Sequence, residues 1–213
     1  CSRTDSGVHA NEFYATLEAH DRGQLLNIPV DRVPRAMCSL LPHDIAVMGA
    51  MEVSGGFHPR YDVDYKEYIY KIWNRSERDP FLNNLAYHYP YQIGDSRLAD
   101  MNEAAAYLEG THDFCAFMAE GSSVKGTVRT VKYCVIERTG DLIILKIAAD
   151  GFLYNMIRII IGTLLDVAAG RILPGEIPSI IDSGNRKNAG STAPACGLYL
   201  NRVVYKDPHL RIK

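Results

Sequence analysis

One short segment near the start of the chain carries residue types that can do acid-base or nucleophilic chemistry: Arg3-Thr4-Asp5-Ser6-Gly7-Val8-His9-Ala10. Asp-Ser-Gly is a common turn, because Asp bonds its own backbone and Gly supplies positive φ. Arg3 adds a chemical interpretation, since a positive charge two residues before Asp5 in a tight loop helps to keep that carboxylate ionised. Asp5 is therefore the first candidate for a catalytic group.

A second Asp-Ser-Gly occurs at Asp182-Ser183-Gly184. Two such loops are what an aspartic protease needs, because its two carboxylates share one proton. However, the apolar pair Ile180 and Ile181 precedes the second triplet and predicts the end of a helix there, and polar residues flank Asp5. A helix end is the preferred interpretation of Asp182, and an aspartic hydrolase stays as a competing hypothesis.

Two further positions combine a functional and a structural interpretation. Arg158 shares a predicted helix face with Asn155 and Gly162 by the three-and-four spacing. It can meet a carboxylate from elsewhere in the fold, or it can extend to solvent from the edge of a core. Tyr68 and Tyr70 share one face of a predicted strand, where tyrosines usually pack, although an aromatic ring in a cleft can also stack on a nucleobase.

The segments that position these residues begin with a short mixed region. We expect a strand over residues 11–17, a helix over 29–41 with Asn27 as a candidate cap, and a strand over 45–53. Gly55-Gly56 then breaks the pattern and marks the best domain boundary. We therefore expect one domain over residues 1–56 and a second over 57–213.

The second domain alternates strand and helix patterns. The expected strands cover 65–73, 127–138, 142–149 and 197–205, and the expected helices cover 95–109, 152–169 and 175–183. Thr139-Gly140-Asp141 separates two of the strands and predicts a hairpin. The strand over 142–149 is apolar on both faces, which predicts a central place in a sheet. The order indicates an α+β fold on a mainly antiparallel sheet.

The composition is that of an ordinary globular protein. The 213 residues include 23 Lys+Arg and 25 Asp+Glu, with 47% hydrophobic residues, which excludes a wholly disordered or collagen-like chain. The net charge of −2 argues against binding to nucleic acid or membrane through an overall positive field. Yet residues 92–120 hold six acids and one base, so the remainder is mildly basic.

The five cysteines are widely spaced and form no CxxC pair, which is typical of a reducing compartment, and we expect a cytoplasmic protein. No metal-ligand spacing or glycine-rich phosphate loop is present. The most apolar helix, 152–169, contains Asn155, Arg158 and Asp166 and is expected to lie in a protein core and not in a membrane. Because the chain begins at Cys1 within a loop pattern, we expect it to be truncated.

Together these motifs resemble the TruA family of tRNA pseudouridine synthases over nearly the whole chain. Each motif is weak alone, but their joint order is specific. The matching segments are Arg3 to Ala10, Phe57-His58-Pro59-Arg60, Lys66-Glu67-Tyr68-Ile69-Tyr70, His112-Asp113-Phe114 with Phe117, Val128-Arg129-Thr130, Phe152-Leu153 with Met156-Ile157-Arg158 and Gly162, and Ala195-Cys196-Gly197-Leu198-Tyr199-Leu200.

The resemblance implies the pseudouridine synthase fold: two mixed α/β domains around mainly antiparallel sheets, with the active-site cleft between them and the first domain incomplete here. It implies that Asp5 is the essential catalytic residue, that Tyr68 contacts the target base and that Arg158 meets the catalytic carboxylate. Arg3, Arg60 and Leu198 join Tyr68 and Arg158 as expected substrate-binding residues.

The resemblance also implies the reaction and its partners. The expected substrate is uridine at positions 38, 39 and 40 of the tRNA anticodon stem-loop, and the expected assembly is a homodimer. No cofactor and no catalytic metal are expected, because the base leaves the ribose and rejoins it without a redox step. The candidates for phosphate contacts are Arg60, Arg129, Lys132 and Arg138.

Two features depart from the family pattern. Ser2 stands before the arginine of the catalytic loop, where the family usually has Gly. The family also carries several tens of residues before this loop, so we expect the chain as given to be inactive by itself. Both departures keep open a non-catalytic RNA-binding homologue as an alternative, although Asp5, Tyr68 and Arg158 are all present.

Overall fold

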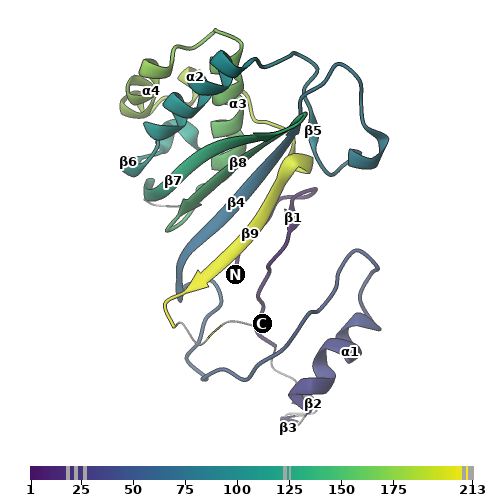
Figure 1. Cartoon of the computed structure of the whole chain (residues 1–213). Helices are drawn as coiled ribbons and strands as arrows, with labels where there is room; N and C mark the ends of the chain where they lie inside the picture. Colours follow the sequence, from purple (N-terminus) through teal and green to yellow (C-terminus); the bar gives the residue numbers. More distant parts are fainter. Residues whose placement is uncertain are drawn as a thin grey trace. The chain divides into compact units, whose positions relative to one another are not determined.

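The protein was analysed as a computed structural model, which describes residues 1–17, 20–21, 24–25, 28–121, 124, 126–207 and 210 (Figure 1). The chain forms two compact units. One unit comprises Cys1, Tyr14–Asp64 and Val204–Lys213, and the other comprises Ser2–Phe13 and Tyr65–Val203. Asp5, Tyr68 and Arg158 therefore all belong to the second unit.

The first unit has little regular structure. It contains a two-stranded antiparallel pair, β2 (His20–Asp21) and β3 (Gln24–Leu25), the 3-10 turn η1 (Val30–Arg32) and the helix α1 (Val33–Cys38). Pro34 lies in the first turn of α1, where its missing N–H is tolerated. The helix expected over 29–41 is thus present in shorter form, and its candidate cap Asn27 lies outside the described residues.

The predictions of two strands near the start of the chain are wrong. Residues 11–17 and 45–53 form no strand in the structure. Residues 45–53 are apolar enough for a strand, but a strand also needs a neighbour that pairs with its N–H and C=O groups. No described ladder contains either segment. Apolar content alone therefore gave the wrong prediction.

The second unit is built on a seven-stranded sheet with the order β1-β9-β4-β8-β7-β6, and β5 pairs with β4. The strands are β1 (His9–Ala10), β4 (Val63–Trp73), β5 (Tyr87–His88), β6 (Gly110–Asp113), β7 (Val128–Thr139), β8 (Leu142–Ala149) and β9 (Leu198–Tyr205). The pairs β4–β8, β7–β8 and β6–β7 are antiparallel, whereas β1–β9 and β4–β5 are parallel.

The strongest strand predictions are confirmed. β8 begins and ends where its pattern predicts, and it lies between β4 and β7, as its apolar residues on both faces require. Gly140, with φ of 60°, turns the chain between β7 and β8. The α+β fold on a mainly antiparallel sheet is also confirmed.

Three helices pack in this unit: α2 (Asp95–Ala106), α3 (Met156–Ala168) and α4 (Ile177–Ser183). Figure 1 shows them together on one side of β6, β7 and β8. The short 3-10 turns are η2 (Pro80–Leu82), η3 (Cys115–Phe117), η4 (Pro174–Glu176), η5 (Arg186–Asn188) and η6 (Ala195–Gly197). None of the described helices has the length and hydrophobicity that crossing a bilayer requires.

The central helix α3 is almost wholly buried, as its sequence predicts, but it begins four residues later than expected. Asn155 takes a left-handed conformation with φ of 58°, so the helix cannot extend through it toward Phe152. Tyr70 and Ile72 of β4 are fully buried in the same core, at 0% and 1% exposure. The left-handed turn at Asn155 thus directly precedes the part of α3 that carries the candidate site residue Arg158.

Candidate active site

Asp5 lies in a closed turn that leads directly into the sheet. Val8 N–H donates to the Asp5 carbonyl at 3.1 Å, and Gly7 has φ of 82°. The turn continues into β1, which pairs with β9 so that His9 lies opposite Tyr199. The two interpretations of this segment, a structural turn and a candidate catalytic carboxylate, are therefore compatible. The turn fixes the backbone of Asp5 beside the sheet.

Arg158 approaches Asp5 from the first turn of α3. Its Nη1 donates to Asp5 Oδ2 at 3.1 Å and to Asn155 Oδ1 at 2.9 Å, and its Nε donates to the Ala193 carbonyl at 2.7 Å. The two charged side chains are 18% and 30% exposed. A guanidinium held by three acceptors keeps a fixed orientation, so it presents a stable positive charge to the carboxylate.

Asn155 has a larger role than the sequence indicated. Its left-handed backbone starts α3, and its side chain accepts a hydrogen bond from Arg158. Asn is enriched at positive φ among residues other than glycine. An Asn directly before an apolar helical pattern was the available signal, but the spacing assigned Asn155 only to a shared helix face.

The third acceptor of Arg158 belongs to a loop that packs on α3 through glycines. A Cβ on Gly162 would overlap the Ser191 carbonyl, so only glycine lets this backbone come so close. Gly190 N–H donates to Thr163 Oγ1 at 2.8 Å, and Ala193 N–H donates to the Arg158 carbonyl at 3.0 Å. The loop thereby fixes the carbonyl that orients Arg158.

Tyr68 lies on β4 and is only 6% exposed. Its hydroxyl is 2.8 Å from Ser2 Oγ, and its ring meets Phe152 edge-to-face at 5.1 Å between centroids. Burial raises the pKa of Tyr68, the hydrogen bond with Ser2 opposes that shift, and the charge of Asp5 adds to it. The phenol is therefore neutral at physiological pH and lies within the field of the Asp5 carboxylate.

Tyr70, the second tyrosine of the predicted pair, has a structural position. Its ring is fully buried, and its hydroxyl donates to the Pro194 carbonyl at 2.8 Å. Burial raises its pKa above the usual range. The bond to Pro194 joins β4 to the loop that carries Ala193. Tyr70 therefore helps to fix the loop whose carbonyl orients Arg158.

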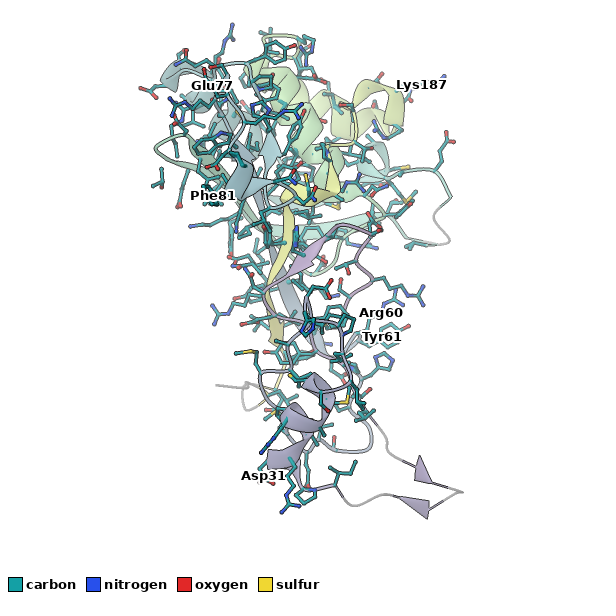
Figure 2. The ribbon with its side chains drawn as sticks, turned by 90° about the vertical axis from the view of Figure 1, so that its right-hand side faces the viewer. Asp31, Arg60, Tyr61, Glu77, Phe81 and Lys187 are labelled. Atoms are coloured by element: carbon teal, nitrogen blue, oxygen red, sulfur yellow. The ribbon has the colours of Figure 1, made fainter. Side chains whose placement is uncertain are left out.

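The remaining expected residues are placed differently. Arg3 is exposed, and among the described residues the carboxylate of Asp5 pairs with Arg158 and not with Arg3. Leu198, the first residue of β9, is 6% exposed. Arg60 belongs to the first unit, where its guanidinium lies 5.5 Å from the ring centroid of Tyr61 (Figure 2).

The candidates for phosphate contacts also differ in the contacts that their charged groups make within the fold. Arg138 forms an ion pair with Asp95 and donates to the Ile93 carbonyl, which uses its donors within the fold. Arg129 donates through Nη1 to the carbonyls of Gly126 and Val128, and Lys132 lies 4.8 Å from the ring centroid of Tyr65.

Asp182 lies at the end of a helix, as the preferred interpretation has it. It is exposed in the last turn of α4, and Gly184 caps that helix with φ of 56°. Across the described ranges, no group of three or more His, Cys, Asp or Glu residues is arranged to hold a metal ion.

Comparison with known proteins identifies the family. The chain is 44% identical over 204 residues to tRNA pseudouridine synthase A of Thermoanaerobacter sp., which covers 96% of this chain and 80% of that relative. The chain belongs to the tRNA pseudouridine synthase family. A relative of the same description from Bacillus licheniformis is 46% identical over 205 residues, with the same coverage of both chains. Residues 104–206 also match a family model described as tRNA pseudouridine synthase.

Membership in the tRNA pseudouridine synthase family confirms the resemblance and the enzyme class, because this is a family of isomerases. It removes the aspartic hydrolase hypothesis, in agreement with the position of Asp182 at a helix end. The match at residues 104–206 includes all of α3 and β9, and so includes Arg158 and Leu198.

Proposed function

We propose that this protein converts uridine to pseudouridine at positions 38, 39 and 40 of the tRNA anticodon stem-loop, with Asp5 as the catalytic carboxylate. The observation that carries the assignment of Asp5 is its ion pair with Arg158 at 3.1 Å. A carboxylate that forms an ion pair with a fixed guanidinium suits the nucleophilic or proton-transfer role that this reaction needs.

The reaction is an isomerisation. The bond between the ribose and the base nitrogen breaks, the base turns, and a bond forms between the same ribose carbon and a carbon of the base. The proton of that carbon is lost, and the freed nitrogen gains one, so no oxidant, reductant or co-substrate is consumed. Asp5 can add to the base, attack the sugar or remove a sugar proton, and each route requires its ionised form.

The target uridine must leave its stack to reach Asp5, which costs a few kcal/mol. We propose that Tyr68 offsets part of this cost by contacting the uracil ring. Its place within the field of Asp5 and its contact with Phe152 support this role. Leu198, which opens β9 close to the Asp5 turn, would contribute apolar surface.

We propose that the rest of the tRNA is held through phosphates and shape, because the side chains available are scattered cations and not a base-reading helix. Arg3 and Arg60 are exposed and suit this role, with Arg129 and Lys132 as further candidates. Arg138 is less suited, since its guanidinium is engaged with Asp95 and Ile93.

Two further expectations remain part of this proposal. The active protein is a homodimer, and it works in the cytoplasm, which suits a tRNA substrate and five cysteines that form no disulfide among the described residues. We also keep the division of the sequence at residues 56 and 57, although the compact units divide the chain differently and place the Asp5 loop in the same unit as Arg158.

The decisive experiment is Asp5→Asn in the full-length gene product, which is the parent protein in every activity test below. The substitution keeps the shape of the side chain and removes its charge. Pseudouridine in transcribed tRNA, measured by mass spectrometry of nucleosides, should disappear while tRNA binding by filter retention persists. Retained turnover in Asp5→Asn would refute the assignment of Asp5. A parent protein that binds tRNA without product would instead support the non-catalytic homologue.

The matched control is Asp182→Asn. It removes the same charge from the other Asp-Ser-Gly triplet, where the side chain is exposed at the end of α4. We expect full activity in this variant. Loss of activity in both variants would mean that a general change of charge, and not the position of Asp5, explains the effect.

A further inference from the structure

We infer that Ser2 is a positioning residue of this active site: its hydroxyl, bonded to the Tyr68 hydroxyl, ties the loop that carries Asp5 to strand β4. The inference rests on the proposed function, because it assigns Ser2 a part in setting up Asp5 and Tyr68. It concerns the residue directly before Arg3, where a glycine could form no such bond.

The contact has the features of a structural tie. The two oxygens are 2.8 Å apart, and 66 positions separate the residues in the chain. Tyr68 is 6% exposed, and a buried phenol O–H needs a partner. Among the described residues, Ser2 is the side chain that accepts or donates at this hydroxyl. Without it, the phenol would lose its hydrogen bond inside the protein.

Ser2 lies three residues before Asp5, so the tie acts on the catalytic turn itself. The turn is fixed at its other side by the ion pair of Asp5 with Arg158. Beyond the turn, His9 stacks on Tyr199 at 4.5 Å between ring centroids, within the β1–β9 pairing. The bond to Tyr68 thus supplies a side-chain anchor before Asp5, next to the hydrogen bond from the Cys1 amino group to the Tyr14 carbonyl.

The bond also gives the buried phenol a partner inside the protein. Either hydroxyl of the Ser2–Tyr68 pair can be the donor. Burial raises the pKa of Tyr68 and the charge of Asp5 adds to that rise, whereas the bond with Ser2 opposes it. Loss of the Ser2 hydroxyl would therefore loosen the turn and leave the buried phenol without this partner.

The first test is a double-mutant cycle on pseudouridine formation. Ser2→Ala should lower kcat about three- to tenfold, the range of one net hydrogen bond, while KM for tRNA changes less. In a Tyr68→Phe background, the same substitution should cost nothing further, because the partner hydroxyl is already absent. Ser2→Thr keeps the hydroxyl and should restore most of kcat. Ser96→Ala, which removes an exposed hydroxyl from α2, is the control and should match the parent.

The second test observes the hydrogen bond without turnover. In protein labelled with carbon-13 at tyrosine Cζ, Tyr68→Phe identifies the Tyr68 signal. Ser2→Ala should shift that signal and leave the signal of Tyr70, which bonds the Pro194 carbonyl, in place. An unchanged Tyr68 signal would refute the bond.

The outcomes separate the two proposals. If the parent makes pseudouridine and Ser2→Ala equals it in kcat, or if Ser2→Ala costs as much in the Tyr68→Phe background, the positioning role is refuted and the proposed function stands. If the parent makes no pseudouridine, both fail, even where the Tyr68 signal shifts. A shifted signal, a lowered kcat and a cycle that is not additive together support the role.

Discussion

Asp5 and Arg158 are separated by 153 positions in the chain, yet their side chains form an ion pair of 3.1 Å. Each of the two residues is also fixed by contacts outside the pair. The turn that leads into β1 holds Asp5, while Asn155 and the Ala193 carbonyl hold Arg158. The pair is therefore imposed by the fold, and under the proposed function it is arranged before substrate binds.

Arg158→Lys tests the geometry of this pair and not its charge. A lysine has one nitrogen and cannot reproduce the planar fork that bonds Asp5 and Ala193 together. Losing one charge-assisted hydrogen bond, at about 1.5–3 kcal/mol, should lower kcat by at least about tenfold. Steady-state pseudouridine formation measures the effect. Arg171→Lys, an exposed arginine paired with Asp166, is the control. Parent activity in Arg158→Lys would show that charge alone suffices.

Asn155 combines a backbone role and a side-chain role, and two substitutions separate them. Asn155→Gly keeps the positive φ and removes the acceptor for Arg158, so stability should stay near that of the parent while kcat falls several-fold. Asn155→Ala removes both and should lose about 1 kcal/mol or more of unfolding free energy in addition. Urea unfolding and turnover measure the two effects. Equal stability of Ala and Gly variants would contradict the backbone role.

The sequence was most informative where one local pattern determines the structure. β8 and β4 carry clear strand patterns, and the apolar spacing of α3 places Arg158 on a helix. Asp5 was found because its turn has a recognisable composition. In these cases the residues within or next to the element determine it. The element can therefore be predicted without knowledge of the rest of the fold, and the structure confirms it.

The features that the sequence did not predict depend on distant partners. The segment 45–53 has strand composition but no neighbouring strand in the described ladders. Nothing in the sequence indicates the bond between Ser2 and Tyr68, because it forms only when β4 lies beside the loop that carries Ser2. The Ala193 carbonyl has no sequence signal, because any residue has one. Its position follows from the close packing of Gly162 against Ser191.

That close packing gives a third prediction. In Gly162→Ala, the added Cβ would overlap the Ser191 carbonyl, which is backbone and cannot rotate away. The loop must shift, so we expect a loss of about 3 kcal/mol or more in unfolding free energy, or failure to fold. Gly175→Ala is the control, since its Cβ would meet nothing within 4 Å. A Gly162→Ala protein as stable as the parent would contradict the close approach.

The buried tyrosines predict how stability depends on pH. Burial raises the pKa of Tyr68 and Tyr70 above the ordinary value of 10.0. The folded state therefore holds these protons more tightly than the unfolded state. The stability that these two phenols contribute is fully present below pH 10 and is lost as the pH rises toward the raised values. Urea unfolding between about pH 9 and 11.5 should show this decline.

Tyr70→Phe should make that decline shallower, because one phenol no longer ionises on unfolding. Ile72→Val, on the same strand, is the control, since it removes a buried methyl group but no phenol. It should lower stability by about 1 kcal/mol and leave the pH slope unchanged. A slope that is the same in Tyr70→Phe as in the parent would contradict the effect of burial.

The cations differ in what their loss should change, and tRNA binding at several salt concentrations separates them. If Arg3 or Arg60 contacts a phosphate, alanine at either position should weaken binding at low salt. It should also reduce the slope of log K against log salt by about 0.7–0.9, the value of one released counterion. Arg138→Ala should leave that slope unchanged and lower stability instead, because its guanidinium bonds Asp95 and Ile93 within the fold. A reduced slope in Arg138→Ala with parent slopes in the other two variants would reverse the assignment.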